Sequence, residues 1–149
     1  MALKPVPEGY HSVTPYLVVS GVDKLLDFVK RAFGAREIHR MARPDGLIMH
    51  AEAQIGDSRI MMGDAAGQHP NMPAMLYLYV PDVDATYQRA LSAGAKSVSE
   101  PKTQFYGDRN GAVADPCGNQ WYIATHVEDV SPDEMERRSR EQMAQQPTV

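Results

Sequence analysis

Short segments of alternating apolar and polar residues run along this chain, and twice the period lengthens from two residues to about 3.6. Residues 13–20 are rich in β-forming side chains. Residues 21–34 then repeat apolar positions at helical spacing and end at a glycine, a common helix stop. Strand-like segments follow at 36–42, 47–55 and 59–63. The first half of the chain is therefore predicted to run β-α-β-β-β.

The same order restarts after a linker at residues 64–74 that is rich in glycine and proline. The predicted elements of this half are a strand at 75–80, a helix at 83–93, a short strand at 96–99, a long loop at 99–110, and strands at 111–114 and 120–125. Segment 16–23 is identical to segment 77–84 at five of eight positions. This internal repeat indicates two copies of one module.

The predicted fold class is α+β. Two tandem βαβββ modules, at about 11–63 and 75–126, form an eight-stranded mixed-sheet cup with the helices on the outside, and residues 1–149 make a single domain. A charged C-terminal helix is predicted at about 131–146, because Ser131 and Glu134 form a capping box around Pro132. This helix packs either on the domain or on a partner subunit.

Strand alternation divides the side chains into two sets. One set is apolar and is expected to pack against the helices; in the third strand it includes Met49. The other set mixes aromatic, polar and ionisable residues, which suits a cleft for a small, flat, partly polar ligand. The candidate ligand contacts in this set are Tyr16, His50, Glu52, Tyr77, Tyr79 and Tyr122.

The net charge, the lengths of the apolar runs and the cysteine count limit the classes of binding partner and the cellular location that we expect. The net charge is −4 and no basic stripe with interleaved aromatics occurs, so nucleic acid is not expected as a partner. No apolar run reaches the roughly eighteen residues that cross a membrane, and residues 1–6 are too polar for a signal peptide. Cys117 is the single cysteine, so we expect a reducing, cytoplasmic location without disulfides.

Three strings resemble a known family: Phe33-Gly34-Ala35, Met49-His50-Ala51-Glu52, and the run from Asp115 to His126. Together with the doubled βαβββ order they resemble the vicinal oxygen chelate superfamily, in its PhnB-like glyoxalase/bleomycin-resistance/dioxygenase branch. The resemblance covers about residues 11–130. It implies frequent homodimers, and either metal-dependent isomerases, lyases and dioxygenases or metal-free proteins that sequester a drug.

The resemblance also implies four metal-ligand positions, one on each of four strands. In this chain they fall on Thr14, on Glu52 (or on His50 if the register slips by two), on Met75 and on Tyr122. Only one of the four is a good ligand for the divalent ions such sites use, whereas a site normally needs at least three. We therefore expect no metal and no other cofactor.

The leading hypothesis is a metal-free, homodimeric protein that binds a small organic ligand, aromatic or drug-like, in a tyrosine-lined cup. One alternative is a metal-dependent glyoxalase or dioxygenase with His50 and Glu52 as ligands. Another is a metal-free isomerase or lyase, with Glu52 as general base and His50 or Tyr122 stabilising developing charge. The sequence leaves open whether the protein is an enzyme.

The long predicted loop offers one more candidate feature. Tyr106, Asp108 and Arg109 lie in it and are placed to close over the mouth of the cleft, with Arg109 meeting an anionic group. Simple solvation at the surface is the alternative for all three.

Overall fold

The computed structural model describes residues 2–146 and contains two βαβββ modules followed by a helix. The first module consists of β1 (Tyr16–Val19), α1 (Val22–Phe33), β2 (Arg36–Ala42), β3 (Ile48–Ile55) and β4 (Ser58–Asp64). The second consists of β5 (Met75–Tyr79), α2 (Val83–Ser92), β6 (Lys96–Thr103), β7 (Asp108–Ala114) and β8 (Gln120–His126). The last element is α3 (Pro132–Gln145). The predicted α+β class with eight strands is confirmed.

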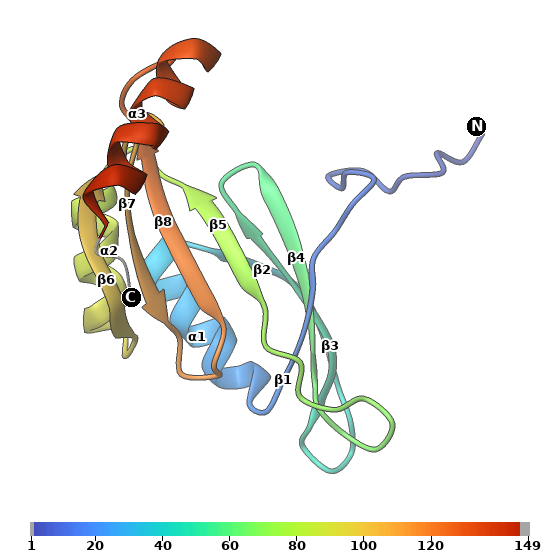
Figure 1. The fold of residues 1–149 in the computed structure, drawn as a ribbon. Coiled ribbons are helices and arrows are strands. Elements are labelled where there is room, and N and C mark those ends of the chain that lie inside the picture. The colour runs from blue at the N-terminus through green and yellow to red at the C-terminus, as the bar shows by residue number, and fades with distance from the viewer. Residues whose placement is uncertain (1, 147–149) are drawn as a thin grey trace.

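Each module forms its own four-stranded mixed sheet. The strand orders are β1-β4-β3-β2 and β5-β8-β7-β6, with the first pair of each sheet parallel and the other pairs antiparallel. Tyr16 lies opposite Met61 in the first sheet, and Tyr77 lies opposite Tyr122 in the second. The internal repeat of the sequence is therefore a repeat in space (Figure 1).

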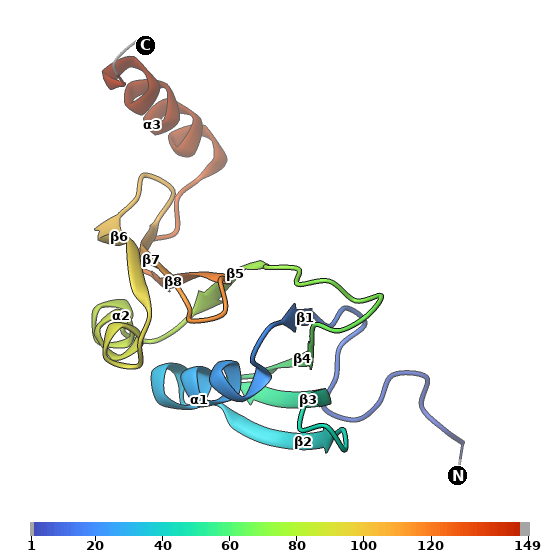
Figure 2. The ribbon, with the colours of Figure 1, turned by 90° about the horizontal axis from the view of Figure 1, so that it is seen from below.

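Helices α1 and α2 pack against each other and join the two modules (Figure 2). The apolar stripe of α1 is fully buried, and α1 ends at Gly34, which adopts the left-handed conformation with φ of 67°. Phe33 meets Trp121 of the second sheet at a ring-centroid distance of 4.8 Å. A single hydrophobic core thus spans both modules. Each large side chain buried there stabilises the fold by about 1.5–3 kcal/mol.

The prediction of a long loop at residues 99–110 was wrong. Strand β6 continues to Thr103 and β7 begins at Asp108, so only a tight turn separates them. Proline and glycine in this segment indicated a loop, but β6 is the edge strand of its sheet, where a proline without an N–H is tolerated. Pro101 packs directly over Gly111 of β7. The two residues therefore fit each other within a hairpin.

The predicted burial of Met49 was also wrong. Ala42 pairs with Ile48 while Met41 pairs with His50, so Met49 is an extra residue at a bulge. Ile48 occupies the buried position, and Met49 is 54% exposed. A bulge changes the face on which following side chains lie, and the sequence pattern gave no sign of it.

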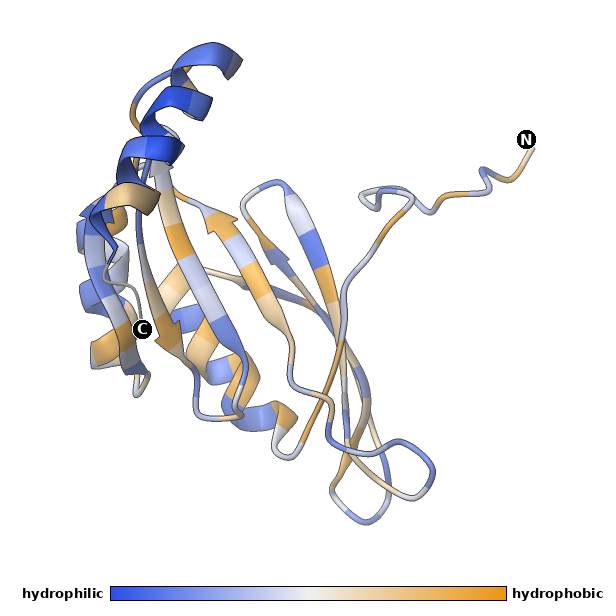
Figure 3. Cartoon of the chain, in the orientation of Figure 1, coloured by the Kyte–Doolittle hydropathy of each residue, from blue (hydrophilic) through white to orange (hydrophobic). Residues whose placement is uncertain are grey.

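Helix α3 stands off from the second sheet and is hydrophilic along most of its length (Figures 2 and 3). Ser131 caps it by accepting a 3.2 Å hydrogen bond from the Glu134 amide, as the sequence predicted. No residue of α3 is buried. Its main tie to the body is Arg138, which donates to the Phe105 carbonyl and to Glu128. Within residues 2–146, no helix is both long enough and apolar enough to span a membrane.

Candidate ligand-binding site

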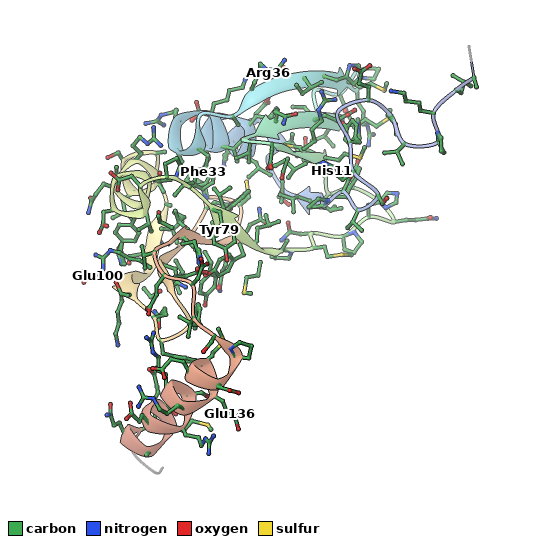
Figure 4. All side chains as sticks on the ribbon, turned by 90° about the horizontal axis from the view of Figure 1, so that it is seen from above. His11, Phe33, Arg36, Tyr79, Glu100 and Glu136 are labelled. Carbon is green, nitrogen blue, oxygen red and sulfur yellow. The ribbon has the colours of Figure 1, made fainter. Side chains whose placement is uncertain are left out.

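The predicted site residues form two groups, one on each sheet. Tyr16, His50 and Glu52 gather on the first sheet, and Tyr77, Tyr79 and Tyr122 gather on the second. In Figure 4, Tyr79 lies among the side chains of the second sheet, while Arg36 marks the first. Contact within each group is direct, so each sheet carries one half of the predicted site.

In the first group, His50 bridges its two neighbours. Its Nε2 lies 2.9 Å from Glu52 Oε2, and its Nδ1 lies 3.1 Å from the Tyr16 hydroxyl. His50 and Glu52 are two apart on β3 and share one face, while β1 delivers Tyr16 beside them. Burial, with a smaller contribution from His39, lowers the pKa of His50. At neutral pH the His50–Glu52 contact is therefore a hydrogen bond of a neutral imidazole, not an ion pair.

In the second group, the tyrosine rings are exposed while their hydroxyls are fixed. Tyr77 and Tyr79 donate hydrogen bonds of 2.7 and 2.8 Å to the same oxygen of Asp108. Tyr77 stacks on Tyr122 with an interplanar angle of 7°, and Tyr79 leans on Tyr77 at 5.3 Å. Their exposed fractions are 42% for Tyr77 and 60% for Tyr79. The result is an exposed aromatic surface whose hydroxyl groups are fixed by hydrogen bonds to Asp108.

Asp108 organises this second group, whereas the sequence placed it in a loop at the mouth of the cleft and not on a strand. It is only 5% exposed and accepts from Tyr77, Tyr79 and His126. Burial acts to raise the pKa of Asp108, but these hydrogen bonds prevail and the pKa lies below its usual value. His126 also contacts Asp129 at 2.7 Å, and the two carboxylates raise the pKa of His126. The incorrect loop at 99–110 concealed Asp108, because strand parity could not then be applied to it.

Three further side chains extend the network toward the β6–β7 turn. Asn110 donates to the hydroxyls of Tyr77, at 3.0 Å, and Tyr106, at 2.7 Å. Gln104 in turn donates to Asn110 at 3.2 Å. Tyr106 therefore joins the second group. Arg109 does not, because both of its hydrogen bonds go to Asp84 at the start of α2.

The family-like string that begins at Asp115 has a structural role. Asp115 is buried and accepts from the Cys117 and Asn119 amides, from the Asn119 side chain and from the Trp121 indole. Asn119 accepts from the amide of Ala74 and so fixes the start of β5. Burial raises the pKa of Cys117 to about 11, which leaves it an unreactive thiol. This string builds the β7–β8 turn.

Hollows adjoin both groups. One of about 410 Å³ is lined by Tyr16, Val18, Met49, Gly63, Asp64 and His69 of the first module. Another, of about 400 Å³, runs along β5 and includes Tyr77 and Tyr79 together with Phe33 and Arg89. Both volumes fall within the range of small-molecule sites, roughly 300–1,000 Å³.

The donor set does not fit a divalent metal. The four positions implied by the family resemblance carry Thr14, Glu52, Met75 and Tyr122, and Thr14 lies outside β1. Among residues 2–146, no three His, Cys, Asp or Glu side chains are grouped as metal ligands.

The doubled βαβββ modules and the exposed polar–aromatic sheet faces define a glyoxalase-like, vicinal-oxygen-chelate class of protein. The family model for the Glyoxalase/Bleomycin resistance protein/Dioxygenase superfamily matches residues 9–123. The chain therefore belongs to this superfamily.

Individual relatives agree with this assignment. An uncharacterised protein of Mycobacterium bovis is 37% identical over 136 residues, which cover 84% of this chain and 90% of the relative. The crystal structure of TioX from Micromonospora sp. ML1 is 26% identical, with a TM-score of 0.66 over 78% of this chain and 99% of TioX. A PhnB protein from Bacillus cereus has the same fold, with a TM-score of 0.60 at 12% identity over 77% of this chain and 99% of that one.

Proposed function

We propose that this protein binds a small, flat organic molecule on its tyrosine-bearing sheet faces without a divalent metal, and that two copies associate to close the cup. The observation that carries the proposal is the fixed aromatic surface of the second sheet. Tyr77 and Tyr79 expose their rings but hold their hydroxyls on buried Asp108. Because these side chains are ordered before binding, a ligand that stacks on them loses little conformational entropy.

A thermal-shift screen of flat aromatic and antibiotic-like compounds tests ligand binding. A compound that binds should raise the melting temperature of the wild type, and the rise should grow with the logarithm of its concentration. The double variant Tyr77→Ala/Tyr79→Ala should lose most of this rise. Val98→Ala, an exposed residue on β6 of the same sheet, is the matched control and should keep it. Equal responses in all three proteins would exclude the tyrosine surface as the site.

Metal content tests the second part of the proposal. The protein is equilibrated with Mn²⁺, Fe²⁺, Ni²⁺ and Zn²⁺, desalted and analysed by mass spectrometry. With a single good ligand among the four positions, no ion should remain at stoichiometric level. A retained ion that is lost in Glu52→Gln would favour the metal-dependent enzyme instead.

The division of the site between two sheets supports the proposed homodimer. Each sheet carries half of the predicted contacts, and these half-sites leave tyrosine and methionine side chains exposed, including Tyr16, Met49, Met75 and Tyr79. Apolar groups left on a sheet face favour a partner surface. Sedimentation equilibrium should give twice the chain mass.

A further inference from the structure

The chain Tyr16–His50–Glu52 has a definite hydrogen-bond direction. Neutral imidazole carries one N–H, and a carboxylate can only accept, so the His50 proton lies on Nε2 and points to Glu52. His50 Nδ1 is then a bare acceptor, 3.1 Å from the Tyr16 oxygen. The Tyr16 hydroxyl therefore donates to His50. The lone pairs of the Tyr16 oxygen therefore remain free to accept a hydrogen bond from a ligand.

We propose that Tyr16, backed by His50 and Glu52, is a proton-accepting site for a weakly acidic ligand in the first-module half of the cup. This inference rests on the proposed function, since it names the chemistry of a ligand bound there. Tyr16 is the residue that touches the ligand, and 47% of its surface is exposed. His50 and Glu52 act through it as positioning residues.

The proton steps balance without a co-reactant. A ligand O–H, or an acidic C–H beside a carbonyl, gives its proton to Tyr16 Oη while the Tyr16 proton passes to His50 Nδ1. The ligand is left as an oxyanion or enolate, and Tyr16 is again a neutral hydroxyl. The imidazolium then donates from Nδ1 to Tyr16 and from Nε2 to the Glu52 carboxylate, which stabilises its charge.

The pKa of His50 determines which ligands can transfer their proton to it. Burial and His39 on β2 lower its pKa below the ordinary histidine value of about 6.5. Only acids stronger than an ordinary imidazolium transfer the proton fully. Weaker acids, such as simple phenols, donate a hydrogen bond to Tyr16 and keep their proton.

The surroundings of Tyr16 leave room for a ligand. The hollow of about 410 Å³ borders its ring, and a Cβ added at Gly63 would lie 3.0 Å from its hydroxyl. Asp64 also lines this hollow, but its carboxylate accepts from the amides of Gly21, Val22 and Ile48 and is occupied. His69 is the other titratable side chain that borders the space.

The second module supplies an internal contrast. The tyrosine in the matching place is Tyr77, and its partner on the third strand of that sheet is Asn110. Asn110 donates to Tyr77, and Tyr77 donates to Asp108, so the direction is reversed. An amide cannot take up a proton, so Asn110 cannot act as His50 does. Tyr77 donates instead to the Asp108 carboxylate, which is already shared with Tyr79 and His126.

Nitrogen NMR of His50 tests the relay without any ligand. At pH 7 the wild type should show the tautomer with the proton on Nε2, and Tyr16→Phe should retain it because the Glu52 contact is unchanged. Glu52→Gln, whose amide can also donate, should shift His50 toward a mixture of tautomers. A proton on Nδ1, or a doubly protonated His50 at pH 7, would overturn the inference whatever the protein binds.

Two matched probes test the ligand class. 4-Nitrophenol can give a proton, and 4-nitroanisole is nearly the same size but cannot. The wild type should bind the phenol about five- to tenfold more tightly than the anisole, because only the phenol can donate a hydrogen bond to Tyr16. Tyr16→Phe should bind both probes equally, while Val98→Ala, an exposed change on β6 of the other sheet, should behave as the wild type.

The outcomes separate the two proposals. Equal binding of both probes by the wild type overturns the proton-accepting role but leaves ligand binding intact. If neither probe binds, the proposed function fails for flat phenols, and this inference fails with it. Circular dichroism and the His50 signals of each variant establish that a lost preference is not a lost fold.

Discussion

Asp115 and Asp108 are both buried carboxylates that organise hydrogen bonds, yet only one of them lies in a conspicuous sequence string. Asp115 accepts from two amides, an asparagine side chain and an indole, all within its own turn. Asp108 accepts from side chains that come from β5 and β8. A local pattern reveals the first kind of residue. The second kind depends on which strands become neighbours, so the sequence did not reveal it.

Replacing Asp115 with alanine should destabilise the protein severely. Four donors would be left buried without an acceptor, and we expect the free energy of unfolding to fall by about 3–5 kcal/mol. Urea denaturation monitored by Trp121 fluorescence measures the change. Asp57→Ala, in the exposed β3–β4 turn, is the control and should stay within about 0.5 kcal/mol of the wild type. A small effect of Asp115→Ala would mean that the turn forms without its carboxylate.

His126 should make stability depend on pH above neutrality. Its pKa is raised in the folded state by hydrogen bonds to Asp108 and then to Asp129. Stabilisation from the protonated form is therefore complete below the unfolded pKa of about 6.5, and it is lost as pH rises through the higher folded pKa. Melting temperatures measured from pH 6 to pH 9 should fall less in His126→Gln than in the wild type.

His11→Gln is the control for this series, because His11 is exposed in the N-terminal segment. It should follow the wild-type curve. Parallel curves for the wild type and His126→Gln would show that the contacts with Asp108 and Asp129 are not linked to folding.

At the level of elements, the sequence predicted the helices and most strands because each depends on a local pattern. The stripe of α1 and the Ser131 N-cap of α3 lie within one segment and were recognised from it. The β6–β7 hairpin and the bulge at Met49 were not, because both depend on pairing between strands. The same limit applies to the site. Strand parity selected tyrosines that the structure brings together, but it could not show the division between two sheets or the role of Asp108.

Helix α3 should contribute little to the stability of a single chain. None of its residues is buried, and its ties to the body are the partly exposed contacts of Arg138. Such pairs contribute about 0–1 kcal/mol each, so removal of residues 131–149 should change the unfolding free energy by about 1 kcal/mol or less. Arg138→Ala in the full chain should reproduce most of that change. A loss that grows with protein concentration would instead place α3 on a partner subunit.

At the scale of the whole molecule, two related half-sites lie on two sheets that share one core. A complete cup can be formed either within one chain or between two chains. If the first-module half of one subunit faces the second-module half of its partner, a variant defective in one half can complement a variant defective in the other. Tyr16→Ala/Glu52→Ala removes the first half-site, and Tyr77→Ala/Tyr79→Ala removes the second. Unfolding and refolding the two variants together at equal amounts should make about half of the dimers mixed, and each mixed dimer should hold one intact cup. We therefore expect about a quarter of the wild-type ligand sites by calorimetric titration, and none in either variant alone. Failure to recover any sites, with mixed dimers demonstrated by native mass spectrometry, would show that each cup is built within one chain.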